Sequence, residues 1–166
     1  MYTSSVAASR HAWYAIALFF LTASFALAIA ANVIGFVTIE TSGSFLINSA
    51  SGALKGAPQD LMIAGNVFSG LAFVCAFVVL AFINHRDGYL ATTGWVLVMT
   101  FIAFVLLIAG CAEHTDLAKS VHPPSFEFGS ISIEYANGLW VGWASAATEF
   151  VALIFLVPTV ATAASL

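Results

Sequence analysis

This sequence of 166 residues contains four long stretches with at most one charged side chain each. They lie between Arg10 and Glu40, between Asp60 and Arg86, between Asp87 and Glu113, and after Glu134, where Glu149 is the one charged residue. Each stretch supplies the roughly 20 apolar residues that a helix needs to cross a bilayer. We therefore predict one domain, residues 1–166, with transmembrane helices over about residues 12–38, 61–84, 88–112 and 138–160.

The composition excludes several classes of protein. Hydrophobic residues make up 61% of the chain and charged residues 7%. Soluble domains carry about 45–50% apolar residues and about 25% charged residues. The net charge of −4 provides no basic surface for a nucleic-acid backbone. No catalytic constellation, phosphate-binding glycine loop or pair of acids stands out in the sequence. We therefore predict a protein without enzymatic activity, cofactor or metal, whose partner is the lipid bilayer and not nucleic acid.

The connections between the predicted helices differ in length. A short turn at residues 85–88 joins the second helix to the third and makes them antiparallel neighbours. The two longer connections, about residues 40–60 and 113–137, lie together on the opposite side of the membrane. Arg10 and Arg86 are close to helix ends, where basic residues favour the cytoplasm. We therefore place both termini and the short turn in the cytoplasm, and the protein in the plasma membrane.

Both longer connections contain strand patterns. Residues 36–47 hold two alternating segments around Ser42-Gly43, which is typical of a hairpin, and residues 126–135 alternate along a longer segment. Three strands with a covered face are more stable than a single hairpin. We therefore predict an all-α membrane bundle of four helices that carries a small extracellular antiparallel sheet. The side chains expected on this sheet are Phe36, Thr38, Phe45, Ile47, Phe128, Ile131 and Ile133.

A distinctive run of residues opens the predicted fourth helix: Gly138-Leu139-Trp140-Val141-Gly142-Trp143-Ala144. This run resembles the start of the fourth helix in claudin-like tetraspans. The layout of four helices, a short cytoplasmic turn and two strand-bearing outer loops is also similar to that superfamily and to amastin-like proteins. Residues 40–60 lack the Trp and the Cys pair of the claudin first loop. The resemblance implies a role in adhesion or membrane organisation.

Small residues recur every four positions at the start of the same helix. Gly138, Gly142 and Ala146 follow this spacing, and Ser145 and Glu149 lie alongside. Small side chains let helix backbones approach closely in lipid. Two interpretations are open: packing inside the monomer, which is favoured for any single face, and contact between the subunits of a homo- or hetero-oligomer.

Glu149 lies about twelve residues into this helix, roughly 18 Å deep and near the bilayer midplane. A carboxylate at that depth is costly unless it is paired, protonated or facing water. The structural interpretation, which we favour, has a protonated Glu149 donating a hydrogen bond to Thr100, Ser24 or a backbone carbonyl. The functional interpretation is a proton or cation site.

The histidines and cysteines suggest no site of their own. His114 is expected in the second long connection as a solvated residue, where it would at most form a weak metal site with His122 and neighbouring acids. Cys75 and Cys111 differ too much in depth for a disulfide.

We predict a non-enzymatic tetraspan membrane protein that acts by lateral oligomerisation and extracellular-loop contacts. Two alternatives from other classes remain. One is a small accessory subunit of a larger membrane complex, in which Glu149 contacts another subunit. The other is an ion or proton conductor that uses Glu149. Co-purification at fixed stoichiometry would indicate the first alternative, and flux that depends on Glu149 would indicate the second.

Overall fold

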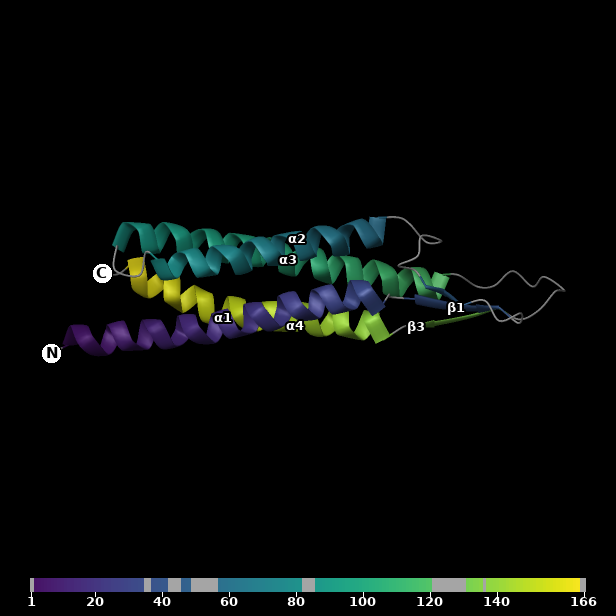
Figure 1. The fold of residues 1–166 in the computed structure, drawn as a ribbon, viewed down its shortest axis with the longest axis horizontal. Helices are drawn as coiled ribbons and strands as arrows, with labels where there is room; N and C mark the ends of the chain where they lie inside the picture. The colour runs from purple at the N-terminus through teal and green to yellow at the C-terminus, as the bar shows by residue number, and fades with distance from the viewer. Residues whose placement is uncertain are drawn as a thin grey trace.

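The computed structural model describes residues 2–34, 37–41, 46–48, 57–81, 86–120, 131–135 and 137–164, with side chains for 11–34, 58–81, 88–116 and 137–162. Four helices run side by side through this part of the chain (Figure 1): α1 (Tyr2–Ile34), α2 (Ala57–Ala81), α3 (Arg86–Ser120) and α4 (Asn137–Ala164). Each contains a segment of 24 to 29 residues that is long and apolar enough to cross a membrane. The chain is therefore an integral membrane protein built on a four-helix bundle.

Three short backbone strands lie at one end of the bundle. They are β1 (Val37–Thr41), β2 (Leu46–Asn48) and β3 (Ile131–Tyr135), in the order β2-β1-β3 with both pairings antiparallel. Ile39 is opposite Ile47 in one pairing and Ile133 in the other. The two chain termini lie at the other end of the bundle (Figure 1). An extracellular surface on this sheet stays a prediction, and Phe36, Phe45 and Phe128 lie outside the described residues.

A series of buried positions runs along each described helix at alternating intervals of three and four residues. In α1 the series is Tyr14, Ala17, Leu21, Ser24, Ala28 and Ala31, and in α4 it is Gly138, Gly142, Ser145, Glu149, Ala152, Leu156 and Thr159. An average spacing of 3.5 residues is the coiled-coil repeat, which winds helices around one another with a left-handed twist. The bundle therefore has the packing that is commonest among membrane helices.

The helices form two closely packed pairs, α1 with α4 and α2 with α3. Glycines bring α2 and α3 close together. A Cβ atom at Gly110 of α3 would lie 2.7 Å from the Cγ and Sδ atoms of Met62, and one at Gly65 of α2 would lie 3.0 Å from Leu107. These two glycines therefore each receive a large side chain from the other helix.

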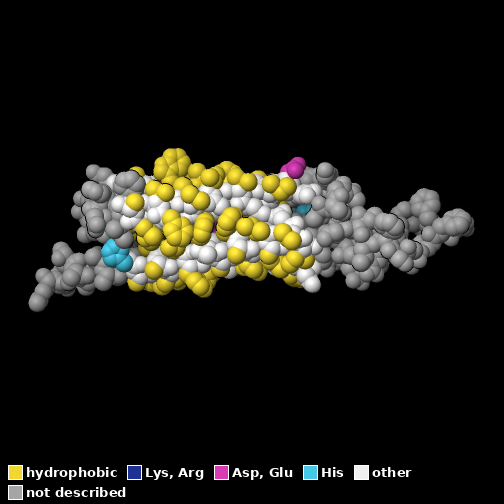
Figure 2. Space-filling view, viewed as in Figure 1, with side chains coloured by type: hydrophobic (Ala, Val, Ile, Leu, Met, Phe, Trp, Pro, Cys, Tyr) yellow, Lys and Arg dark blue, Asp and Glu magenta, His cyan; other side chains and the backbone are white. Residues whose placement is uncertain are grey.

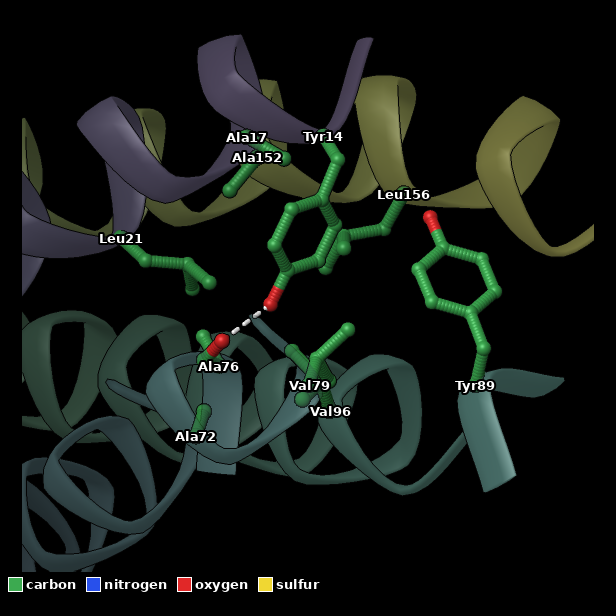
Figure 3. Close-up of a cluster of buried hydrophobic side chains, with 10 residues drawn as sticks. All are labelled: Tyr14, Ala17, Leu21, Ala72, Ala76, Val79, Tyr89, Val96, Ala152 and Leu156. Carbon is green, nitrogen blue, oxygen red and sulfur yellow. Dashed lines mark hydrogen bonds between the residues drawn. The ribbon is translucent and has the colours of Figure 1, made fainter. Parts of the chain in front are cut away.

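Two apolar clusters occupy the two halves of the bundle. One contains Tyr14, Leu21, Ala72, Val96 and Leu156, together with other buried residues (Figure 3). Its Tyr14 hydroxyl crosses from α1 to α2 and donates a hydrogen bond to the carbonyl of Ala76. The other cluster consists of Ala31, Met62, Leu107, Cys111, Leu139 and Ala146. The middle of the bundle, between the clusters, holds the polar residues described below.

Large apolar side chains cover the outside of the described helices. On α2, for example, Ile63, Val67, Leu71 and Val74 are exposed, and hydrophobic atoms extend along the face shown in Figure 2. The described side chains include no lysine or arginine. This exterior suits contact with lipid, because unpaired charges would be costly there.

Helix ends differ from the sequence-based prediction at several places. α1 begins at Tyr2 and ends at Ile34, so Thr38 belongs to β1 and not to the helix. α3 continues to Ser120, eight residues beyond the predicted end. The expectation that His114 is a solvated loop residue was wrong, because it lies on α3 and is 1% exposed. An apolar stretch indicates which residues lipid surrounds. It does not locate the end of the helix, because a helix can continue beyond that stretch into polar sequence.

Candidate functional site

Glu149 is the one acidic residue in the middle of the described helices. It lies halfway along the α4 span Asn137–Thr162 and is 0% exposed. Neither of its carboxyl oxygens has a hydrogen-bond partner among the described residues. A buried polar group without a partner is rare in folded proteins, so the position of the Glu149 carboxyl group calls for a physical explanation.

Two serines from other helices lie beside the Glu149 carboxyl group. They are Ser24 of α1 and Ser69 of α2, both fully buried, and each is close to the middle of its own span. Neither hydroxyl makes a hydrogen bond of standard geometry to the carboxyl group, and the Ser69 hydroxyl has no partner among the described residues. Three helices therefore contribute to one polar layer, which we define as Ser24, Ser69, Ser145 and Glu149.

Ser24 and Ser145 form a reciprocal clamp between α1 and α4. The Ser24 hydroxyl donates to the Ser145 carbonyl at 3.0 Å, and the Ser145 hydroxyl donates to the Ser24 carbonyl at 3.0 Å. The two hydroxyl oxygens are 3.2 Å apart. Because Ser145 is one helical turn before Glu149, this clamp fixes the part of α4 that carries the carboxyl group.

Of the two side chains expected as partners of Glu149, one lies beside its carboxyl group and the other bonds elsewhere. Ser24 lies beside the carboxyl group but makes no hydrogen bond of standard geometry to it, so the expected bond stays a prediction. Thr100 instead donates its hydroxyl proton to the Val96 carbonyl of its own helix at 2.7 Å. Sequence reasoning missed Ser69, although its position at the middle of the second apolar stretch matches the depth of Ser24 and Glu149.

Apolar side chains enclose the polar layer along the bundle axis. Leu21 of α1 and Ala152 of α4 lie on one side of it, and Leu107 of α3 and Leu139 of α4 lie on the other. This arrangement can hold a proton or a hydrogen bond away from water. It does not provide a continuous polar path among the described residues.

All five residues of the predicted small-residue face are buried within the single chain: Gly138, Gly142, Ser145, Ala146 and Glu149. The extensive contacts of α4 with α1 occupy much of this face. A partner subunit therefore cannot reach Gly138, Gly142, Ser145 or Glu149 unless the bundle opens, whereas Ala146 lines a hollow on the outside of the bundle. Of the predicted sheet residues, Thr38, Ile47, Ile131 and Ile133 belong to the backbone strands.

Two adjoining hollows follow the line where α3 meets α4, which we call the α3–α4 seam. The first, of about 290 Å³, is lined by Thr115, Leu139, Trp140 and Trp143. The second, of about 300 Å³, is lined by Phe104, Ile108, Trp143, Ala146, Ala147 and Phe150. Trp143 lines both, and Phe104 stacks on Phe150 with ring centres 5.4 Å apart. The seam is therefore an apolar, aromatic-lined surface on the outside of the bundle.

Two asparagines near one end of the described spans bond to the same backbone carbonyl. The carbonyl of Ala28 accepts from Asn32 of the same helix at 3.0 Å and from Asn66 of α2 at 3.2 Å, and the second bond joins α1 to α2. Cys75 and Cys111 are free thiols. The described residues contain no group of three His, Cys, Asp or Glu side chains that is suited to a metal ion.

Comparison with known proteins finds no matching family model and no matching curated protein.

Proposed function

We propose that this protein is a non-enzymatic tetraspan of the plasma membrane, similar in layout to claudin-like proteins, that acts by lateral association and by contacts of its extracellular loops. The observation that best supports association is the α3–α4 seam. A second copy of the chain is the partner we propose for it. Both termini are placed in the cytoplasm in this proposal, because Arg10 and Arg86 lie near the corresponding helix ends.

The shape of the seam favours a helix as its occupant. From Leu139 to Phe150 the lining covers twelve residues of α4, or about 16 Å from first to last. Trp140 is 64% exposed and Phe150 is 50% exposed, so both are available to a neighbour. Hollows beside rigid aromatic rings accept the side chains of a packed helix, and such close packing drives association in lipid.

The small-residue face of α4 is not the surface we propose for association. Gly138 and Gly142 are buried within the bundle, and their exposure would require separating α4 from α1. Trp143 of the seam needs no such rearrangement, because it lines both outer hollows. The backbone strands at the end opposite the termini support the second part of the proposal, contacts through the outer loops.

The test of association is energy transfer between donor- and acceptor-labelled copies in liposomes at a series of protein-to-lipid ratios. We expect Trp143→Ala to raise the dissociation constant about tenfold, or about 1.4 kcal/mol, as is typical of a central aromatic residue in an interface. Trp95→Ala is the matched control, because Trp95 is 59% exposed on α3 and does not line the seam hollows.

Two results would contradict this proposal. Transfer no greater than random at every ratio would show a monomer. Equal weakening by Trp143→Ala and Trp95→Ala would place the contact elsewhere. Co-purification of a different membrane protein at fixed stoichiometry, without self-association, would favour an accessory subunit instead.

One observation favours a second candidate function, conduction of protons or ions: the buried and unpartnered Glu149 carboxyl group at the middle of the α4 span. The apolar clusters on both sides of the polar layer favour a closed site over a path. Flux measured in liposomes separates the two, because a conductor should lose transport in Glu149→Gln, whereas an associating tetraspan should show none above protein-free liposomes.

A further inference from the structure

We propose that Glu149 and Ser69 form an occluded proton-binding site at the centre of the bundle. In this site the carboxyl group of Glu149 carries one proton, is neutral, and shares a hydrogen bond with the Ser69 hydroxyl. The ligand is a single proton, and the bond links α4 to α2. This inference does not depend on lateral association.

The charge balance of the bundle requires a positive ligand or a neutral carboxyl group. The described side chains contain no lysine or arginine, so no such cation can pair with Glu149 from within the described spans. A carboxylate without a counter-charge is costly at the bilayer centre. The other residues of the polar layer supply hydroxyl groups, which are uncharged. A bound proton removes the charge without any further ligand.

The geometry favours a proton over a metal cation. Hard cations are held by several oxygen ligands at once. The hydroxyl groups of Ser24 and Ser145 already bond to each other's backbone carbonyls. The carboxyl group of Glu149 and the hydroxyl of Ser69 are the members of the layer that have no partner among the described residues. A carboxylic acid and a hydroxyl can each donate and accept, so these two groups satisfy one another.

The hydrogen bond joins helices that do not belong to the same closely packed pair. The most extensive contacts join α1 to α4 and α2 to α3, whereas Glu149 is on α4 and Ser69 is on α2. The bond therefore links the two pairs across the middle of the bundle. The apolar clusters on either side keep the proton from exchanging readily with water.

Infrared spectroscopy of the purified protein in liposomes at neutral pH tests the site directly. The carbonyl stretching band of a protonated carboxylic acid is separate from the carboxylate and amide bands. We expect this band in the unmodified protein and its loss in Glu149→Gln. Glu113→Gln is the matched control, because Glu113 is exposed near the end of α3 and should leave the band unchanged.

Ser69→Ala tests the partner. Loss of a hydrogen bond to the carboxyl group should move the band to higher frequency, whereas Thr148→Ala should not move it, because the Thr148 hydroxyl bonds within its own helix. In D₂O the band should shift only as slowly as the buried amides at the helix centres exchange. The Ser69→Ala and D₂O measurements still test the site if Glu149→Gln fails to fold.

Three results would overturn the proposal. An absent acid band would show an ionised Glu149. A band unmoved by Ser69→Ala would remove Ser69 from the site. A shift in D₂O that is complete within the mixing time would show a site open to water, as a conductor requires.

Discussion

Most of the hydroxyl groups that form hydrogen bonds in the described helices bond their own helix, and a few bond a neighbouring helix. Thr93 and Thr100, for example, donate to the carbonyls four residues earlier, at 2.7 Å in both cases. Such bonds satisfy the hydroxyl within the helix and add nothing between helices. Ser24 and Ser145 differ, because their bonds cross between α1 and α4. Burial in the bundle is therefore not enough for a hydroxyl group to link helices, because Thr93 and Thr100 are as buried as Ser24 and Ser145.

The first prediction concerns this clamp. Ser145→Ala removes a buried interhelical donor with little change of volume, so we expect the free energy of unfolding to fall by about 0.6–2 kcal/mol. Thr148→Ala is the control on the same turn, because its hydroxyl bonds only to the carbonyls of Ala144 and Ser145 among the described residues. Reversible unfolding in mixed micelles measures both. Equal losses in the two variants would mean that the clamp contributes nothing specific.

At the scale of whole helices, glycine sets the distance between α2 and α3. Gly110 receives the Met62 side chain so closely that a Cβ atom there would be 2.7 Å from it. A methyl group at this position forces Met62 or the helix to move, because well-packed interiors tolerate added volume poorly. Gly94 is on the same helix, yet a Cβ atom there would have nothing within 4 Å.

The second prediction compares these two glycines. Gly110→Ala should lower the free energy of unfolding by about 1–3 kcal/mol through overpacking. Gly94→Ala should leave it unchanged or raise it by up to about 1 kcal/mol, since alanine is the better helix former. The same micelle titration measures the pair. A stabilising Gly110→Ala would show that α2 and α3 can separate there without loss.

The existence of the helices could be predicted from the sequence, but their rotation about their own axes could not. Gaps between charges locate apolar stretches, and the described residues have a membrane-length helix in each. In lipid both faces of a helix are apolar, so polarity does not mark the inner face. Size marks it instead: on α2, Gly65, Ser69 and Ala72 are buried, whereas Val67 and Leu71 are exposed.

Part of the candidate site could also be predicted from the sequence. Glu149 stands out because a charge in an apolar stretch is conspicuous, and Ser24 was one of its expected partners. Ser69 is inconspicuous as a lone serine, and it is recognised only when helix rotation brings it to the carboxyl group. The prediction that His114 lies in a loop was wrong because the polar residues that follow the apolar stretch do not end the helix, and α3 continues to Ser120.

For the whole molecule, the two ends of the bundle differ in what they carry. Both termini lie at one end, and the backbone strands lie at the other (Figure 1). The described middle is apolar over the face shown in Figure 2, and each of its four helices exposes large apolar side chains, so it gives no information about which end faces the cytoplasm. The basic residues predict that orientation: in the sequence, Arg10 and Arg86 adjoin the spans on the side of the termini, and Lys55 and Lys119 adjoin the two longer connections. Because each side carries two basic residues, the predicted orientation depends on which pair lies closer to the membrane boundary.

The last prediction tests the orientation. Arg86 begins α3 directly, and Arg10 immediately precedes the α1 span that starts at His11, so both are at the membrane boundary where basic residues act most strongly. A cysteine in place of Asp87 should therefore react with a membrane-impermeant maleimide only after cells are permeabilised, whereas one in place of Ser132 in β3 should react in intact cells. The unmodified chain is the control for Cys75 and Cys111, which lie within the spans. The reverse pattern would place the strands in the cytoplasm. The proposal of contacts through extracellular loops would then lose its basis.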